Sequence, residues 1–224
     1  MFIQPFDASL DEAEWRNWIA TGGKFGVLAV AAGIDDSGAP AAPEMIPTHF
    51  TLLQDQILIH LARPNKVLPL LETGNPVSLL VTGDYAYVPN QWRARPDAPV
   101  EDGVPTSYYA AVNFVCKPSV LKTPEEIAEV LRQQMADFQP EGGYSPVDAH
   151  EGYYSSMMSG IRAVSLQILS VEAKFKYDDH KSVEFRERMI ERLEERDLPL
   201  DAGAAAEQRR RLKRIGEWKE FRQQ

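Results

Sequence analysis

Alternating apolar and polar positions recur along the first 180 residues and predict β-strands. The alternation is clearest in EMIPTHFTLL and QILIHLA, two runs separated by a tight turn at Gln54–Asp55. Further runs follow in FGVLAVAA, NPVSLLVTGDYAYV, YYAAVNFVCKPSVL and AVSLQILSVEAKFKY. Consecutive strands joined by short turns favour antiparallel pairing over parallel βαβ units. The pattern therefore predicts a mainly β fold, an antiparallel β-barrel with added helices.

Helix signals precede the first strand and separate later ones. SLDE, Ser9–Glu12, has the Ser-x-x-Glu form of a capping box and predicts a helix through Ile19. A short helix is expected near 64–73, ended by Gly74. A longer helix is expected near 123–138, because TPEE supplies a capping residue, a first-turn proline and a capping-box glutamate.

Two charged helical patterns close the chain, over 182–196 and 204–221. We therefore predict a barrel domain over 1–180, with its helices inserted, and a helical extension over 181–224. Within the barrel domain, residues 89–107 are rich in proline and polar side chains and predict a loop of about nineteen residues. A loop of that length in a compact domain is usually functional or mobile.

Composition narrows the class of protein. The chain has 224 residues, 44% of them hydrophobic, which allows a sizeable core. No apolar run is long enough to span a membrane, and the N-terminus lacks the order of a secretory signal, so a cytoplasmic location is expected. The single cysteine, Cys116, excludes a disulfide within the chain and cysteine-rich metal sites. Its apolar strand context predicts a buried, unreactive thiol.

Charge argues against direct nucleic-acid binding over most of the surface, because the net charge is −9. Residues 207–224 are the exception, with seven cations and three anions, 7 − 3 = +4. This basic C-terminal helix is the one candidate for DNA contact. It is also typical of a solvated or dimer-packing helix, because Leu212, Ile215 and Trp218 form a narrow apolar stripe.

The corner ARPNK, where a strand ends, is the first candidate site. Arg63, Asn65 and Lys66 follow the strand, and Pro64 suits the first turn of a helix. Free backbone N–H groups at a helix start, together with two cations, form a plausible phosphate-binding site. A solvated turn is the alternative interpretation of the same residues.

Two strand histidines form a second candidate. In IPTHF, Thr48 and His49 alternate in direction, so only one of them points inward. His60 lies one strand later and can meet His49 across the hairpin. A metal site is not expected, because no third ligand has suitable spacing.

Hydroxyls and aromatic rings gather where the long loop enters the next strand. Thr106, Ser107, Tyr108 and Tyr109 are consecutive, and Tyr85 and Tyr87 precede the loop on one strand face. Such groups suit an aromatic heterocycle with polar edges, and they equally suit an aromatic core. No nucleophile motif or general base is evident.

Taken in order, these segments resemble one family. The series THFTLL, ILIHLARPNK, LLETGNPVSLLVTGDYAYVPNQW, VPTSYYAAVNF and GIRAVSLQILSVEAKFKYDDHK is similar to the PaiB family, the FMN-binding negative transcriptional regulators. The resemblance covers about residues 25–193. It implies an FMN-binding split β-barrel, the fold of pyridoxamine-phosphate oxidases and flavin reductases, in a homodimer with FMN at the subunit interface.

The resemblance also implies site residues. Lys66 corresponds to a phosphate-binding lysine, with Arg63 and Asn65 nearby, and the remaining cofactor-binding candidates are Thr48, His49, His60, Tyr87, Trp92, Thr106 and Tyr109. The chain departs from the family pattern at Ser107–Tyr108, Asn113, Gly83–Asp84 and the segment KYDDHKS, 176–182.

Three functions remain open at this point. The first is a flavin-binding regulator or sensor of the PaiB type. The second is an enzyme on the same fold, a flavin-dependent oxidoreductase or a haem-handling relative, in which the cofactor supplies the chemistry. The third is a direct DNA-binding regulator that uses the basic C-terminal helix.

Overall fold

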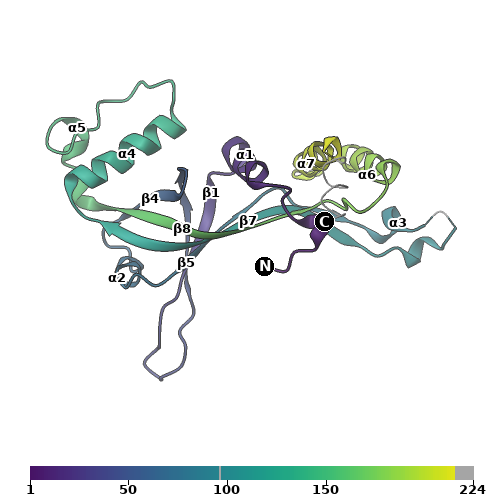
Figure 1. Cartoon of the computed structure of the whole chain (residues 1–224), viewed down its shortest axis with the longest axis horizontal. Helices are drawn as coiled ribbons and strands as arrows, with labels where there is room; N and C mark the ends of the chain where they lie inside the picture. Colours follow the sequence, from purple (N-terminus) through teal and green to yellow (C-terminus); the bar gives the residue numbers. More distant parts are fainter. Residues whose placement is uncertain (96, 215–224) are drawn as a thin grey trace. The chain divides into compact units, whose positions relative to one another are not determined.

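The computed structural model describes residues 1–95 and 97–214 of the chain (Figure 1). They divide into two compact units. The barrel unit comprises Lys24–Val81 and Asn113–Val171, and the helical unit comprises Met1–Gly23, Thr82–Val112 and the chain from Glu172 onward. Two sixteen-residue strands, β7 (Thr106–Leu121) and β8 (Ile161–Lys176), contribute residues to both units. The predicted domain boundary at residue 180 stays a prediction.

The barrel unit is built on an antiparallel sheet. Its strands pair in the order β2-β1-β5-β7-β8-β4-β3. Register is fixed at several positions, such as Phe25 opposite His49 and His60 opposite Ala163. The strands, besides β7 and β8, are β1 (Phe25–Val30), β2 (Glu44–His49), β3 (Thr51–Leu52), β4 (Gln56–Ala62) and β5 (Val77–Thr82).

This sheet curls back on itself. β2 and β3 stand at opposite ends of the strand order, yet only Phe50 separates them in sequence. One residue spans at most about 3.5 Å, so the two ends of the sheet must come together. Phe50 is fully buried at this junction. The mainly β, antiparallel barrel that the alternating pattern predicted is therefore confirmed.

Apolar side chains fill the barrel unit. The alternation of β4 buries Ile57 and Ile59 completely. Helix α4 (Pro124–Phe138) covers one face of the sheet beside β4 (Figure 1), where Leu58 packs with Ile127 and Val130. The predicted capping box at Thr123 is present. Shorter helices α2 (Leu68–Glu72), α5 (Gly152–Ser155) and η3 (Met158–Gly160) complete the unit.

The helical unit gathers elements from three parts of the chain. Helices α6 and α7 lie side by side (Figure 1), and β6 pairs with the start of β7. The elements are η1 (Pro5–Asp7), α1 (Glu12–Gly22), β6 (Ala86–Val88), α3 (Asn90–Arg93), η2 (Val100–Asp102), α6 (Val183–Arg196) and α7 (Asp201–Lys213).

Several helix boundaries differ from the sequence prediction. Asp11, not Ser9, caps α1, because its carboxylate accepts the Glu14 N–H at 2.7 Å. The helix continues three residues past Ile19. The long loop over 89–107 contains two short helices, α3 and η2.

The end of the chain was predicted as a helix over 204–221. Helix α7 begins earlier, at Asp201, and is described as far as Lys213. Ile215 and Trp218 of the predicted apolar stripe lie outside the described residues. No helix within residues 1–95 and 97–214 is long and apolar enough to cross a membrane.

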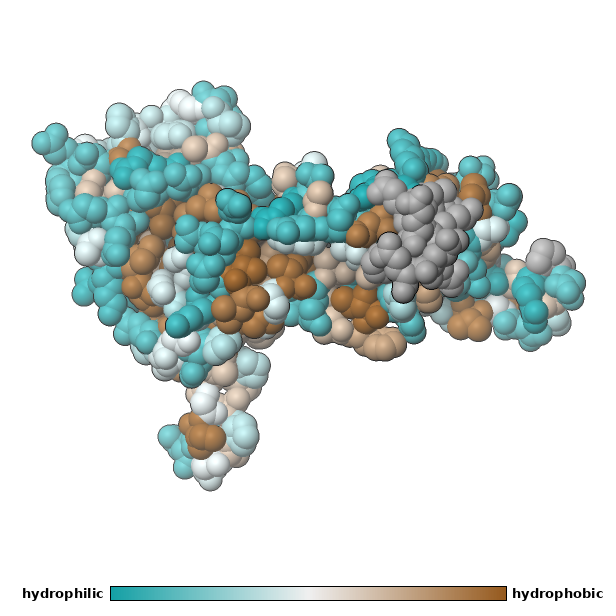
Figure 2. Space-filling view, in the orientation of Figure 1, coloured by the Kyte–Doolittle hydropathy of each residue, from teal (hydrophilic) through white to brown (hydrophobic). Residues whose placement is uncertain are grey.

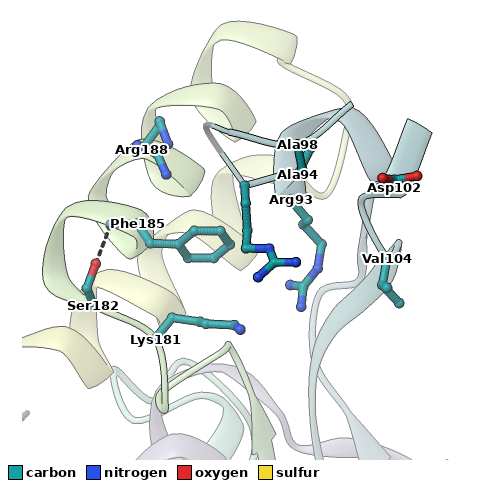
Figure 3. Close-up of a pocket in the computed structure, with 10 residues that line it drawn as sticks. Arg93, Ala94, Ala98, Asp102, Val104, Lys181, Ser182, Phe185 and Arg188 are labelled. Atoms are coloured by element: carbon teal, nitrogen blue, oxygen red, sulfur yellow. Dashed lines mark hydrogen bonds between the residues drawn. The ribbon is translucent and has the colours of Figure 1, made fainter. Parts of the chain in front are cut away.

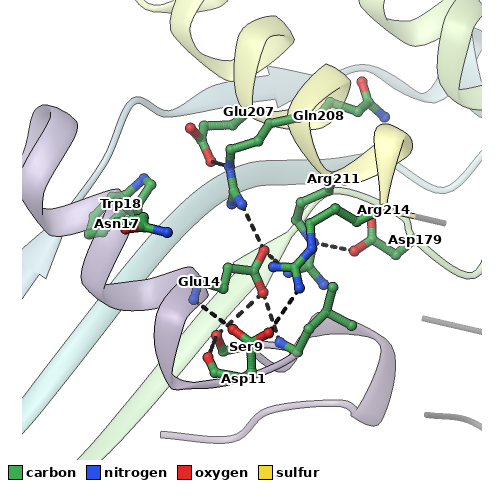
Figure 4. Close-up of polar contacts among 12 residues, drawn as sticks. Ser9, Asp11, Glu14, Asn17, Trp18, Asp179, Glu207, Gln208, Arg211 and Arg214 are labelled. Atoms are coloured by element: carbon green, nitrogen blue, oxygen red, sulfur yellow. Dashed lines mark hydrogen bonds and ion pairs between the residues drawn. The ribbon is translucent and has the colours of Figure 1, made fainter. Parts of the chain in front are cut away.

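Buried ion pairs tie the helical unit together. Arg211 of α7 is 3% exposed and pairs with Glu14 of α1, at 2.8 Å, and with Asp179, which follows β8 (Figure 4). Arg186 of α6 reaches the same Asp179 at 2.6 Å. One buried carboxylate thus connects both C-terminal helices to the end of a strand. The sequence suggested DNA contact or a solvated or dimer-packing helix over residues 207–224, and Arg211 is instead buried in ion pairs within the helical unit.

Candidate functional site

The corner after β4 is shaped by backbone and amide contacts. The Arg63 N–H donates to the Gly160 carbonyl at 2.8 Å, and the Asn65 N–H donates to the Ala62 carbonyl at 2.9 Å. The Asn65 side-chain oxygen accepts the Val67 N–H at 3.1 Å. Asn65 therefore holds the turn in shape, and its side-chain amide nitrogen has no described partner.

A shallow hollow opens at this corner, which we call the β4–α2 hollow. Its volume is about 360 Å³. Three cations line it, Arg63, Lys66 and Arg162, and Glu72 is the one anion among the lining residues. Glu72 is engaged by Lys122 at 2.8 Å. The remaining lining residues are Pro64, Asn65, Leu68 and Pro69.

The donor set of the hollow fits a phosphate group. Arg63 and Lys66 lie in the turn that follows β4, and Arg162 lies on β8. Guanidinium groups bind phosphate oxygens with paired hydrogen bonds, and the lysine ammonium adds a third positive charge. The predicted helix start contributes less than expected. Helix α2 begins at Leu68 rather than at Pro64 and has only five residues, so the attraction for an anion comes from side chains.

The two strand histidines do meet. Their ring centroids are 5.1 Å apart, and the His49 ring also contacts the Phe138 ring at 5.3 Å. Burial, and then the neighbouring His60, lower the pKa of His49. At neutral pH this ring is therefore held uncharged. Thr48 points inward, as alternation required of one residue in the pair, and its hydroxyl donates to the His49 carbonyl at 3.0 Å.

A buried glutamine fixes the tautomer of His60. The Gln134 side chain is 3% exposed, and its amide nitrogen donates to the Leu58 carbonyl at 3.3 Å. Its amide oxygen therefore faces His60 Nδ1, 2.7 Å away, and accepts a hydrogen bond from the Nδ1–H group. This leaves His60 Nε2 as a hydrogen-bond acceptor. Gln134 was not predicted, because a glutamine on a charged helix carries no signal of its partner.

Four predicted site residues lie in the helical unit, in two clusters. In the first, Lys176 donates to the Thr106 hydroxyl at 2.8 Å and lies 5.8 Å from the Tyr109 ring centroid. Lys174 stands 5.6 Å from the same ring. The two lysines alternate with Phe175 on β8, so they share the face opposite to it.

The second cluster centres on Arg196 of α6. Its guanidinium lies 4.8 Å from the Trp92 ring centroid and donates to the Tyr87 carbonyl at 2.7 Å. Arg196 is also held by Asp201, at 2.5 Å. The Trp92 ring is thus in contact with a cation of α6, a contact that the sequence motif gave no reason to expect.

Two departures from the family pattern are linked in the structure. The Tyr108 hydroxyl donates to the Asp178 carboxylate at 2.8 Å, and Arg93 forms an ion pair with the same carboxylate. Burial first, and then Asp178, raise the pKa of Tyr108, so the phenol stays protonated. Asp178 also has a positive φ of 55°, which an aspartate tolerates in a tight turn.

Two other expectations concern reactive groups. Cys116 is fully buried, and burial raises the pKa of its thiol to about 12, as expected for an unreactive cysteine. In the part of the chain that the structure describes, no group of three His, Cys, Asp or Glu side chains is placed to hold a metal ion.

Comparison with protein families identifies the domain. The family described as Putative FMN-binding domain matches residues 1–170. The chain belongs to this family. Every residue of the β4–α2 hollow falls inside the matched range, and membership supports FMN as the cofactor. A comparison with curated proteins gave no significant match.

Solved structures give the same fold for the FMN-binding domain. A flavocytochrome from Azotobacter vinelandii matches with a TM-score of 0.56 and 15% identity, over 75% of this chain and 69% of that chain. An FAD and haem binding protein from Mycobacterium smegmatis matches with a TM-score of 0.56 and 16% identity, over 75% and 73%. The split-barrel prediction is confirmed at the level of the fold.

Arg162 is the member of the hollow that sequence reasoning missed. It lies almost one hundred residues after Lys66, and only the pairing of β4 with β8 brings it to the corner, where it stands opposite Leu61. The available signal was the motif GIRAVSL, in which one cation interrupts an apolar strand. A strand cation is common at a solvent edge, so the motif alone does not indicate a ligand.

Proposed function

We propose that this protein is an FMN-binding split-barrel domain of the PaiB type that seats the flavin phosphate in the β4–α2 hollow. The convergence of Arg63, Lys66 and Arg162 within the family-matched residues carries the proposal. A phosphate monoester has nearly two negative charges at neutral pH, which three cations can neutralise.

Each residue of the hollow has a distinct task in this proposal. Arg63 and Arg162 offer paired N–H donors, and Lys66 offers a mobile point charge. Asn65 keeps the turn in the shape that presents them. When bound, FMN supplies the redox chemistry of its ring, and the protein supplies position and electrostatics. The ring contacts predicted for Thr48, His49, His60, Tyr87, Trp92, Thr106 and Tyr109 stay predictions.

A comparison of FMN with riboflavin tests the phosphate seat. Riboflavin has the same ring system and lacks the phosphate, so the hollow should favour FMN. We expect Lys66→Gln and Arg162→Gln each to weaken FMN binding about tenfold or more, because each removes a charged hydrogen bond. Riboflavin binding should change little. Flavin fluorescence titration measures both.

Lys117→Gln is the matched control for this titration. Lys117 is an exposed strand lysine of the same unit and does not line the hollow. Its replacement should leave FMN affinity unchanged. Equal FMN and riboflavin affinities in the unaltered protein, or unchanged FMN affinity in both hollow variants, would contradict a phosphate seat at this corner.

We also propose that the protein is a homodimer, because the barrel unit exposes apolar side chains on one sheet face. Phe25, Met45 and Leu80 come from the adjacent strands β1, β2 and β5 and are 62%, 56% and 38% exposed. The register places Met45 opposite Ala29 and Leu80 opposite Val27, so the exposed apolar positions are neighbours. Apolar surface also shows over the barrel unit in Figure 2. Such patches commonly mark protein interfaces.

A charge placed on this face should break the dimer. We expect the wild-type protein to sediment with twice the mass of one chain and Met45→Glu to sediment as a single chain. Glu44→Gln changes a charge on the same strand and should keep the dimer. A monomeric wild-type protein, or a dimeric Met45→Glu variant, argues against this face as the interface.

The regulatory role belongs to the same proposal and rests on the resemblance to the PaiB family. The oxidoreductase alternative differs in one observable, the oxidation of NADH or NADPH by the FMN-loaded protein. Sustained turnover favours the enzyme, and its absence with both donors favours the regulator. Direct DNA binding has less support, since Arg209, Arg210 and Arg211 are all engaged by carboxylates.

A further inference from the structure

A second basic pocket lies in the helical unit, at the start of α6. We call it the α6 pocket. Its volume is about 490 Å³, within the range of small-molecule sites. In Figure 3, Lys181 and Phe185 point from the α6 side into the space that faces Asp102 and Val104. The lining residues are Arg93, Ala94, Arg95, Ala98, Asp102, Val104, Lys181, Ser182, Phe185 and Arg188.

The pocket has a net positive charge. Four of its lining residues are cations and one, Asp102, is an anion. Arg93 is also neutralised by its ion pair with Asp178. The balance is 4 − 2 = +2, in a protein whose net charge is −9. A local excess of positive charge inside a concave surface of an acidic protein attracts anions.

Most of this charge is free to bind. Arg95 and Lys181 have no ion pair among the described residues. Arg188 likewise has no ion pair among those residues, and its guanidinium lies 5.7 Å from the centroid of the Phe185 ring. The Nε atom of Arg93 is buried and has no hydrogen-bond partner within residues 1–95 and 97–214. A buried donor without a partner is costly unless a ligand or a water satisfies it.

The start of α6 adds to the positive potential. Ser182 lines the pocket and caps this fourteen-residue helix, and its hydroxyl accepts the Phe185 N–H at 3.2 Å. The remaining free N–H groups of the first turn place partial positive charge at the same end. The helix start thus adds to the positive potential of the pocket, and the side-chain cations contribute most of it.

One part of the pocket is apolar. Ala94, Ala98 and Val104 contribute aliphatic surface, and Phe185 contributes an aromatic ring. The Arg93 guanidinium lies 5.9 Å from the centroid of that ring. Inorganic phosphate alone would leave this surface unused. A planar organic group attached to the anion would cover it.

We propose that the α6 pocket binds an organic dianion, a phosphate monoester or dicarboxylate that also carries a flat apolar group. The pocket lies only partly within the residues that match the family, because six of its ten lining residues, from Arg93 to Val104, precede residue 170. Four of its lining residues, from Lys181 to Arg188, follow residue 170, where the family match ends. The pocket shares no lining residue with the β4–α2 hollow, so this ligand is additional to the flavin phosphate proposed for that hollow.

Calorimetric titration of the full chain, without added flavin, tests the pocket. Adenosine 5′-monophosphate and phthalate are the two dianionic probes, and adenosine is the uncharged control. We expect at least one dianion to bind about tenfold or more tightly than adenosine, and its affinity to fall as salt rises. The probe that binds shows whether the pocket takes a phosphate or a carboxylate.

Paired variants locate the binding. Lys181→Gln combined with Arg188→Gln should weaken the dianion about tenfold or more, because both side chains are exposed cations of the pocket. Arg63→Gln combined with Lys66→Gln, in the β4–α2 hollow, should leave it unchanged. Circular dichroism of each variant verifies folding.

Three results would overturn the proposal: no binding of either dianion, equal affinity for adenosine, or loss of binding only in the hollow variant. The outcome is independent of the flavin assignment. A protein that binds no FMN can still bind a dianion at α6, and a protein with a working flavin site can fail this titration.

Discussion

The two units of the molecule both bury apolar side chains, but only one of them buries charged groups. Every charged residue that is buried in the described part of the chain belongs to the helical unit, and the barrel unit buries only neutral polar groups. The buried neutral polar residues of the barrel unit are Thr48, Thr51 and Gln134. The charged ones are Asp7, Glu14, Lys174, Asp178, Asp179, Arg186, Asp201 and Arg211.

This difference determines how many of the stabilising contacts in each unit can be predicted from the sequence. The buried face of a strand is encoded by apolar residues at alternating positions within a few residues, so the strands β4 and β8 could be predicted from the sequence. A buried ion pair joins residues that are distant along the chain. Arg211 and Glu14 are 197 positions apart, and nothing near either residue indicates the other.

The candidate site shows the same limit. Arg63, Asn65 and Lys66 are adjacent in sequence, so their common corner could be predicted. Arg162 joins them only through strand pairing. Asp178 and Tyr108 appeared as unrelated departures from a family pattern, and their hydrogen bond became visible only in three dimensions.

Removal of Arg211 should have the largest effect on stability. In an Arg211→Met variant, the carboxylates of Glu14 and Asp179 lose a buried partner. Breaking one member of a buried ion pair costs about 3–5 kcal/mol. Urea unfolding followed by tryptophan fluorescence measures the loss, because Trp15 and Trp18 lie on the same helix as Glu14.

Arg209→Met is the matched control for this variant. Arg209 lies on the same helix and pairs with Glu194, but both side chains are about half exposed. Exposed ion pairs contribute about 0–1 kcal/mol. If the two variants lose the same stability, the buried network does not hold the helical unit together, and the contrast between the units fails.

The pH dependence of stability should also differ between the helical unit and the barrel unit. Asp7 is buried, its Oδ1 atom has no described partner, and burial raises the pKa of its carboxyl from 3.8 to about 6. Since the folded pKa is raised, folding favours the protonated form. Asp7 therefore weakens stability as the pH rises through this window, and the weakening persists above it.

Asp7→Asn should remove this penalty. We expect the variant to be more stable than wild type by about 1–3 kcal/mol at pH 8, and the difference to vanish at about pH 3, below the unfolded pKa of 3.8, where the Asp7 carboxyl is neutral in the folded and the unfolded protein. Leu79→Ala, in the apolar core of the barrel unit, should lose about 2–5 kcal/mol at both pH values. Equal pH dependence of Asp7→Asn and wild type would refute this account of Asp7.

The most direct test of the central claim is an absorption spectrum of the purified protein, recorded before and after FMN is added and the excess removed by gel filtration. We predict flavin bands that elute with the protein, and their loss in the Lys66→Gln, Arg162→Gln double variant. A spectrum without flavin bands after reconstitution would mean that the split barrel is kept and that the β4–α2 hollow does not hold FMN.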